Sequence, residues 1–139
     1  MRASSSRAAA MRKADKWMSL YIRTRDSQQW ECKYFRCISC GRLLPIAQAD
    51  AGHYINRSHM SLRFSEDNVH AQCRRCNRFD EGNATGYRAG LVAKIGEQRL
   101  ALLEAAKYRT HKLAAAELDI LAEYFKSETK KFKFQITTR

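Results

Sequence analysis

Four of the five cysteines form two pairs with the spacing Cys-x-x-Cys, namely Cys37/Cys40 and Cys73/Cys76. Two such pairs are typical of a tetrahedral structural zinc site. Disulfides are expected in exported proteins, but the odd cysteine count and the lack of an apolar export signal argue against them. A thioredoxin-like redox site would need a single pair at the start of a helix. The pairs therefore predict zinc ligands, and we expect the fifth thiol, Cys32, to be a spare buried one rather than a substitute ligand.

Three residues around the second pair have side chains suited to phosphodiester hydrolysis: His53, Asn68 and Asn77. Hydrolysis needs a base that activates water, and a neutral imidazole fits that role near neutral pH. It also needs a divalent cation that stabilises charge on the phosphate, and Mg²⁺ prefers oxygen ligands. Asn77 directly follows Cys76, so it can offer its side-chain oxygen from a segment anchored by zinc. Asn68 can hold a loop and orient the imidazole, because an amide both donates and accepts hydrogen bonds.

Taken in order, Cys-x-x-Cys, His53, Asn68 and Cys-x-x-Cys-Asn77 resemble the HNH (ββα-metal) endonuclease signature in its HNN variant. A longer set of motifs, spread over residues 10–105, is similar to the phage lambda NinG (Rap) family. These motifs are Lys16-Trp-Met-Ser-Leu-Tyr-Ile-Arg, Ala51-Gly-His-Tyr, Leu62-Arg-Phe, Asn68-Val-His-Ala-Gln-Cys-x-x-Cys-Asn and Tyr87-Arg-x-Gly-Leu.

The resemblance implies an α+β fold, mostly α, in which a zinc-clamped ββα-metal centre is flanked by N- and C-terminal helices. It implies a structure-specific DNA endonuclease that uses Mg²⁺ or Mn²⁺ to nick branched recombination intermediates such as Holliday junctions and D-loops. In such a site His53 is the general base, Asn77 a metal ligand and Asn68 the positioning residue. The family also suggests a homodimer, because a four-way junction needs two nicks, and a phage or prophage protein that acts in the cytoplasm of a bacterial host.

One position departs from the HNH pattern. Many HNH enzymes carry an aspartate that binds the catalytic metal directly before the base histidine, where this chain has Gly52. Asp50 lies two residues earlier, which on a strand places it on the same face as residue 52. Asp50 is therefore the candidate replacement ligand for the catalytic Mg²⁺ or Mn²⁺. In the alternative arrangement His53 itself binds the metal, and water is activated in another way.

The chain carries 26 Lys and Arg against 14 Asp and Glu, a net charge of +12. This predicts attraction to a polyanion, most commonly nucleic acid, and arginine suits phosphate because its planar fork donates two hydrogen bonds. No apolar run approaches the about 20 residues that a membrane span requires. Each cation alone is an ordinary solvated charge, but a cluster around the site favours contact with the DNA backbone. The residues expected to make this contact are Arg12, Lys16, Arg23, Arg57, Arg63, Arg74, Arg75 and Arg78.

A length of 139 residues suits one domain. Apolar residues at three- and four-residue spacing predict a basic amphipathic helix over 7–26, and we expect the zinc-bound core over 32–83, with a β-hairpin at 46–55. Helices are predicted over 87–95 and 97–107, split at Gly96, and over 112–128, within a helical C-terminal part at 84–128. Residues 129–139 form a basic tail that we expect to be flexible.

Two alternatives stay open at the level of the sequence. The chain could be a zinc-ribbon DNA-binding accessory protein of recombination whose nuclease site has decayed, with Gly52 as the motivating residue. It could also be an HNH nuclease that reads sequence, although nothing marks a dedicated reading module. His59 and His70 have no assigned role. The aromatic side chains that could stack on unpaired bases are Trp17, Trp30, Tyr34 and Tyr54, of which Trp17 also belongs to an apolar helix face.

Overall fold

A computed structural model describes residues 3–137, which form an α+β fold that is mostly helical and has two small sheets. β1 pairs with β2 and β3 pairs with β4, both antiparallel. None of the helices in the described part has the length and apolar character needed to cross a membrane. The elements in chain order are α1 (Ala3–Arg25), η1 (Gln28–Trp30), β1 (Tyr34–Arg36), β2 (Leu43–Pro45), η2 (Ile46–Gln48), β3 (Ala49–His53), β4 (Val69–Cys73), the π-helix η3 (Arg75–Phe79), α2 (Ala84–Ile95), α3 (Glu97–Ala106) and α4 (Ala115–Lys130).

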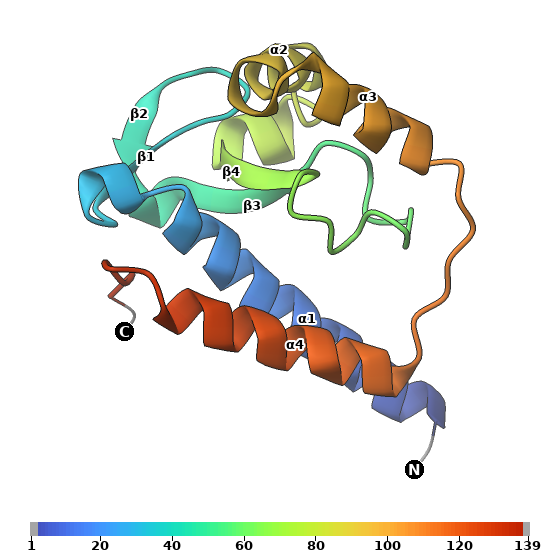
Figure 1. Ribbon diagram of the computed structural model, residues 1–139. Helices are drawn as coiled ribbons and strands as arrows, with labels where there is room; N and C mark the ends of the chain where they lie inside the picture. Colours follow the sequence, from blue (N-terminus) through green and yellow to red (C-terminus); the bar gives the residue numbers. More distant parts are fainter. Residues whose placement is uncertain (1–2, 138–139) are drawn as a thin grey trace.

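Helices cover both sides of the β3–β4 hairpin. In Figure 1, α1 and α4 lie on one side of it, and α2 and α3 lie on the other. On the first side, Val69 of β4 packs against Met18 and Phe125. On the second side, Tyr87 of α2 donates its hydroxyl to the carbonyl oxygen of Gly52 at 2.6 Å. The hairpin, which carries several of the candidate site residues, is therefore fixed from two directions.

α1 and α4 form the lower layer in Figure 1 and run side by side in the same direction. Ala10 and Ala14 recur on one face of α1, are buried, and pack against Leu118 of α4, as the apolar spacing predicts. At the same end of the contact, Nε of Arg7 donates to the carbonyl oxygen of Leu113 at 2.8 Å. Small residues at this interface let the two helices approach closely.

The predicted hairpin at 46–55 is wrong. Residues 46–48 form the 3₁₀ turn η2, and β3 pairs with the distant strand β4, in a register that sets His53 opposite Val69. The connecting loop of residues 54–68 is too long for a tight hairpin turn. It is closed instead by the buried side chain of Asn68, which bonds the N–H and the carbonyl oxygen of Ile55 at 2.8 and 2.9 Å.

α2 packs directly on the first cysteine pair through two glycines. A Cβ at Gly86 would lie 2.2 Å from the carbonyl oxygen of Ser39, and a Cβ at Gly90 would lie 2.0 Å from that of Ile38. These distances leave no room for a side chain, so the four-residue spacing of the glycines gives the helix a flat face for the backbone around the cysteines. The predicted split of α2 and α3 at Gly96 is observed, with a φ of 86° at that residue.

The ends of the helices differ in part from the predictions. The helix predicted over 7–26 spans Ala3–Arg25, and the one predicted over 112–128 spans Ala115–Lys130, because Glu117 accepts the N–H of Ala114 and sets the start there. The tail is held where it is described: the side-chain amide of Gln28 bonds the carbonyl oxygen and the N–H of Phe134 at 2.7 and 3.1 Å. Residues 1, 2, 138 and 139 of the predicted domain lie outside the described residues.

Candidate functional site

The two cysteine pairs converge on one point. The Sγ atoms of Cys37, Cys40, Cys73 and Cys76 all lie within 4.8 Å of one another, and those of Cys40 and Cys73 are 3.9 Å apart. Tetrahedral Zn–S bonds of about 2.3 Å place sulfur atoms about 3.8 Å apart. The four thiols therefore fit a metal ion such as zinc. Cys32 is buried outside this cluster, with its Sγ 3.9 Å from the carbonyl oxygen of Thr24.

Hydrogen-bond donors point at the clustered sulfur atoms, an arrangement that favours the thiolate form. The N–H of Cys73 donates to Sγ of Cys37 at 3.2 Å, and the N–H of Cys76 donates to Sγ of Cys73 at 3.4 Å. Asn83 donates its amide to Sγ of Cys76 at 3.4 Å and also caps α2 by accepting the N–H of Gly86. The cysteine cluster is therefore tied to the first turn of α2.

His53 lies at the end of β3 with its imidazole half-buried. Its Nε2 is 2.9 Å from the carbonyl oxygen of Arg63, and because a carbonyl oxygen only accepts, Nε2 carries the proton of the neutral ring and Nδ1 the lone pair. Burial lowers the pKa of His53 below its usual value of 6.5; the positive charge of Arg57 acts in the same direction, and the negative charge of Asp15 opposes it. The imidazole is therefore neutral at physiological pH, as a general base requires.

Asp50, within β3, is held by the segment that follows β4. Nδ2 of Asn77 donates to Oδ2 of Asp50 at 2.9 Å, and Arg78 donates Nε and Nη2 to the two carboxylate oxygens, at 2.9 Å each. The structure thus brings the two predicted ligands of the catalytic metal together. Turning the Asn77 amide over would place two oxygens about 3 Å apart, which matches neighbouring positions of a Mg²⁺ octahedron with bonds of about 2.1 Å. The pair fits a divalent cation once Arg78 leaves the carboxylate.

The structure does not join His53 to this pair by a direct contact. His53 follows Asp50 by three residues, about 10 Å of strand, and the alternation of side chains turns the two toward opposite faces. Both lie near the same helix, however: Asp15 of α1 influences the pKa of His53, and Asp50 that of Arg23, also on α1. The base and the oxygen pair are therefore two points on opposite faces of β3, both within reach of charges on α1, and we call the space between α1 and β3 the strip. A substrate phosphate would have to connect them.

Asn68 is a positioning residue rather than a catalytic one. Its side chain is fully buried, and its three hydrogen bonds go to the N–H and carbonyl oxygen of Ile55 and to the carbonyl oxygen of Leu62 at 3.1 Å. A saturated, enclosed amide cannot touch a substrate. It shapes the loop of residues 54–68, and that loop supplies the Arg63 carbonyl that orients His53.

The position where many HNH enzymes carry aspartate points into the protein. A Cβ at Gly52 would lie 1.9 Å from Oε1 and 2.9 Å from Cβ of Gln72, whose side chain is fully buried. The near-contact with Cβ means that rotation of the Gln72 side chain cannot make room. Gly52 is therefore required by packing, and its presence gives no support to the idea of a decayed metal site.

His70, which had no role at the level of the sequence, belongs to a buried charged network between α1 and α2. Asp26 is bonded by Arg25 at 2.8 Å and by Lys94 at 2.9 Å. Nδ1 of His70 accepts from Nζ of Lys94 at 2.8 Å, while Nε2 donates to the carbonyl oxygen of Asp67 at 2.9 Å. Burial, with the charges of Lys94 and Arg25, lowers the pKa of His70 to about 3, so the ring is neutral. It binds neither zinc nor a surface phosphate.

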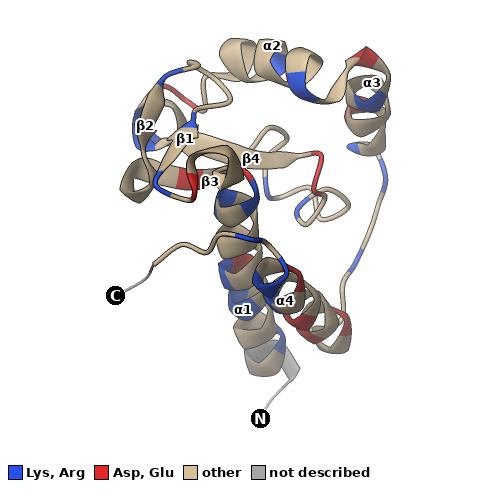
Figure 2. Cartoon of the chain, turned by 60° about the vertical axis from the view of Figure 1, so that its left-hand side comes forward, with Lys and Arg blue, Asp and Glu red and all other residues tan. Residues whose placement is uncertain are grey.

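The predicted DNA-contacting side chains fall into two groups. Three are already engaged: Arg63 pairs with Asp15, Arg78 pairs with Asp50, and half-buried Arg23 bonds within its own helix. Figure 2 shows acidic residues gathered on α4, which makes that helix a poor surface for a polyanion. The other five predicted contacts are exposed, and these are Arg12, Lys16, Arg57, Arg74 and Arg75.

Comparison with known proteins decides the family. The family model described as bacteriophage lambda NinG protein matches residues 2–134. The chain belongs to the NinG family. The NinG protein of Escherichia phage lambda is 36% identical over 116 residues, which cover 82% of this chain and 53% of that protein. The NinG protein of Salmonella phage P22 has the same identity and coverage. That of Escherichia phage 933W is 32% identical over 121 residues, which cover 86% of this chain and 56% of that protein. This NinG-family chain thus spans just over half the length of these relatives. No solved structure matches it.

Two acidic residues of this NinG-family chain were missed by reasoning from the sequence. Asp15 of α1 bonds Nε of Arg63 at 3.1 Å and so steadies the loop that orients the candidate base. Glu104 of α3 accepts from the Tyr54 hydroxyl at 2.6 Å and from Arg88 at 3.0 Å. Their partners are far away in the sequence, and neither residue belongs to a motif. For Asp15, the signal in the sequence was an acidic residue within a basic amphipathic helix.

Proposed function

We propose that this chain is an HNH-type DNA endonuclease that nicks branched recombination intermediates such as Holliday junctions and D-loops. The observation that carries the proposal is the arrangement along β3. A neutral His53, oriented by the Arg63 carbonyl, lies on the same strand as the Asp50–Asn77 oxygen pair. The cysteine cluster supports this arrangement, because Cys76 directly precedes Asn77 and fixes its backbone.

In this proposal a phosphodiester lies in the strip between α1 and β3. Nδ1 of His53 takes a proton from a water molecule whose oxygen forms a bond to phosphorus while the bond from phosphorus to one sugar oxygen breaks. That oxygen takes up a proton, so one strand end carries a phosphate and the other a hydroxyl. Asp50 and Asn77 would hold Mg²⁺ or Mn²⁺, which would supply charge stabilisation at the phosphate and at the leaving oxygen.

Arg78 links cation binding to DNA binding in this mechanism. In the structure its guanidinium neutralises both oxygens of Asp50, although 54% of its side chain is exposed. If Asp50 held a cation, the Arg78 guanidinium would be free to bind a phosphate of the same strand. Bidentate binding of either a carboxylate or a phosphate is the characteristic chemistry of arginine.

The exposed cations of the chain support a DNA substrate whose arms run in more than one direction. The exposed cations Arg12 and Lys16 lie on α1, Arg57 lies on the loop after β3, and Arg74 and Arg75 lie at the start of η3. They lie on three separate elements instead of lining one groove-shaped element, which suits a branched substrate. We propose that a second copy of the chain supplies the second nick of a four-way junction, and that the protein acts in the cytoplasm of a bacterial host.

The proposal is tested by strand nicking of a labelled four-way junction, a D-loop and a linear duplex, with Mg²⁺ or Mn²⁺ and with EDTA. We expect metal-dependent nicks on branched DNA that disappear in His53→Ala while junction binding is retained. His111→Ala is the matched control, because His111 is exposed and precedes α4. Cleavage of the linear duplex as fast as the junction would contradict the branched-substrate proposal.

A zinc-dependent DNA-binding accessory protein is the second candidate. The observation that favours it is the occupied state of Asp50, whose two oxygens are both bonded to Arg78, together with the three-residue separation of His53 from Asp50. In this case the wild type and His53→Ala bind the junction equally, and neither leaves nicked strands at any cation concentration. The same experiment therefore decides between the two candidates.

A further inference from the structure

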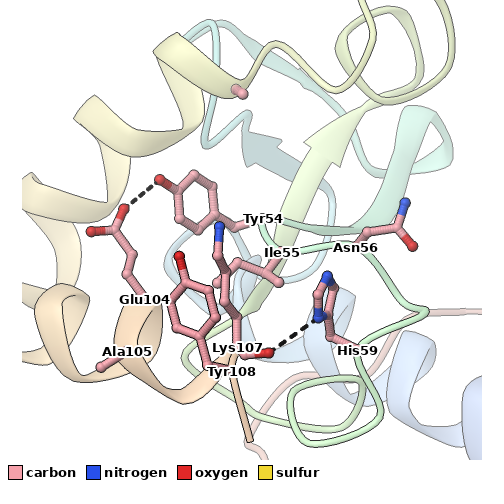
Figure 3. Close-up of a pocket in the computed structure, with 9 residues that line it drawn as sticks. Tyr54, Ile55, Asn56, His59, Glu104, Ala105, Lys107 and Tyr108 are labelled. Atoms are coloured by element: carbon pink, nitrogen blue, oxygen red, sulfur yellow. Dashed lines mark hydrogen bonds between the residues drawn. The ribbon is translucent and has the colours of Figure 1, made fainter.

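A hollow of about 660 Å³ lies between the loop after β3 and the end of α3. In Figure 3, Tyr54 and His59 line it from the loop, and Glu104 and Tyr108 line it from α3 and the turn after it. A second hollow of about 450 Å³ shares Tyr54 and continues along α2 as far as Arg88. Both volumes are of the size that holds small organic groups. We call the first one the Tyr108 hollow.

The Tyr108 hollow has one fixed hydrogen-bond acceptor. Oε2 of Glu104 accepts from the hydroxyl of Tyr54 at 2.6 Å and from Nε of Arg88 at 3.0 Å, whereas Oε1 has only the longer bond to Nη2 of Arg88 at 3.3 Å. Burial and the nearby Glu104 raise the pKa of Tyr54 to about 12, so its hydroxyl stays a donor. A carboxylate oxygen accepts two hydrogen bonds, so Oε1 can take a further donor from a bound group.

The Tyr108 hollow also has an aromatic surface with a cation beside it. The side chain of Tyr108 is 81% exposed, and Nζ of Lys107 lies 5.3 Å from the centre of its ring. His59 closes the loop side and donates Nδ1–H to the carbonyl oxygen of Lys107 at 3.2 Å, which leaves its Nε2 as an acceptor. Exposed aromatic rings next to cations are the surfaces on which unpaired nucleobases stack.

We propose that the Tyr108 hollow binds an unpaired nucleobase of the DNA strand whose phosphate lies at His53. The proposal rests on the proposed nuclease function: Tyr54, which lines the hollow, directly follows His53 in the chain. The base stacks on Tyr108 and donates an exocyclic amino group to Oε1 of Glu104. Cytosine, adenine and guanine carry such a group, whereas thymine does not.

Such a site would favour a branched substrate over an intact duplex. Unpaired or loosely stacked bases are available at a branch point, while a paired base must first be pulled out of the stack at a cost of a few kcal/mol. A base held in the Tyr108 hollow would fix the register of the strand relative to His53. The hollow therefore contributes to DNA binding, before any bond is cut.

The test is equilibrium binding in buffer without added Mg²⁺ or Mn²⁺, which stops cleavage and leaves the cysteine-bound metal in place, to a duplex with one unpaired cytosine and to the fully paired duplex. We expect Tyr108→Ala to lose roughly tenfold in affinity for the first duplex and nothing for the second, since stacking on one aromatic ring has about this effect. Tyr108→Phe should bind like the wild type. Leu102→Ala is the control, because Leu102 is 71% exposed on α3 but lies outside the Tyr108 hollow. An unpaired thymine should bind several-fold more weakly than cytosine.

Two results would overturn the proposal: equal losses on both duplexes in Tyr108→Ala, which would indicate a contact with the backbone, or no loss on either. The nuclease proposal fails separately. Absence of nicks in Mg²⁺ together with a Tyr108-dependent preference for the unpaired base would refute cleavage and keep the base site. Nicks that do not depend on Tyr108, in a protein with no preference for unpaired bases, would refute the base site and keep the nuclease proposal.

Discussion

The backbone oxygen of Arg63 accepts a hydrogen bond from Nε2 of His53 at 2.9 Å, while the guanidinium of the same arginine is ion-paired with Asp15 of α1. One residue therefore orients the candidate base through its backbone and is itself held to a long helix through its side chain. The tautomer of His53 and the direction of its lone pair are fixed before any substrate arrives. Such preorganisation is what a proton-accepting group needs to act at a defined phosphate.

We expect nicking to require the unprotonated form of His53. Burial lowers the pKa of this imidazole, so the rate should be flat above pH 6.5 and fall only at lower pH, as the ring becomes protonated. Initial nicking rates measured across pH at constant ionic strength check this. An acid limb with its midpoint above 6.5 would contradict the burial argument.

Loss of one clustered cysteine should remove the metal and the fold together. Cys76→Ser should abolish bound zinc and leave the centre unfolded, because the free energy of binding a structural zinc ion, about 10–16 kcal/mol in small zinc domains, is also folding free energy. Metal content by mass spectrometry and circular dichroism measure the two effects. Cys32→Ala is the control, since Cys32 is buried but outside the cluster, and it should keep one zinc per chain. A stable, zinc-free Cys76→Ser protein would refute the assignment.

Replacing Gly52 by the aspartate of many HNH enzymes should destabilise the protein and should not raise its nicking rate. Gly52→Asp places a Cβ against the buried Gln72 and a charged group in the interior, so we expect destabilisation of about 3 kcal/mol or more. Gly52→Ala should show the steric part alone, about 1–3 kcal/mol. Urea denaturation measures both. A Gly52→Asp variant of unchanged stability and higher nicking rate would show that the position does face the metal site.

The protein should lose stability in acid through His70. The pKa of His70 is about 3 in the folded chain and close to 6.5 when unfolded, so the unfolded state binds the extra proton between these values. The free energy of unfolding therefore falls as pH drops from 6.5 toward 3, by up to about 1.4 kcal/mol per pH unit. In His70→Gln this part of the slope should vanish. The difference between the two proteins, measured by urea denaturation at several pH values, removes the common effect of zinc loss; identical slopes would contradict the prediction.

Arg78 should oppose cation binding while helping DNA binding. In Arg78→Ala the carboxylate of Asp50 is released, so we expect tighter Mn²⁺ binding by calorimetry and weaker binding of a junction. The slope of log affinity against log salt should drop by about one, the contribution of one phosphate contact. Arg75→Ala is the control: its side chain is exposed and should lower the salt slope without changing Mn²⁺ affinity. Unchanged Mn²⁺ affinity in Arg78→Ala would separate Asp50 from the metal.

The sequence predicted well what depends on local spacing. The Cys-x-x-Cys pairs predicted a metal-fitting cluster, and apolar periodicity predicted the four helices and their split at Gly96. Asp50 and Asn77, both assigned to one cation, are joined by a hydrogen bond, while the cation itself stays a prediction. These features follow from short-range geometry, which a single sequence carries.

What could not be predicted depends on contacts between distant parts of the chain. The strand partner of residues 49–53 lies beyond a long loop, and only the burial of Asn68 shows how that loop closes. The clash that makes Gly52 necessary involves Gln72, a residue with no motif of its own. The separation of His53 from Asp50 differs from these, because it follows from strand alternation over three residues and could have been predicted from the sequence.

The parallel contact of α1 with α4 has a consequence for how the protein is made. The helix beside His53 is synthesised first, and the helix that covers its apolar face, through Leu118 and Phe125, is synthesised last within the described chain. Until α4 docks, Ala14 and Met18 lack their contacts with Leu118 and Phe125, and α1 is held beside the hairpin by fewer contacts, among them that of Met18 with Val69. Because such a contact joins segments about a hundred residues apart, it forms late and slowly. A nascent chain therefore carries every candidate catalytic residue for some time before it can hold them in position.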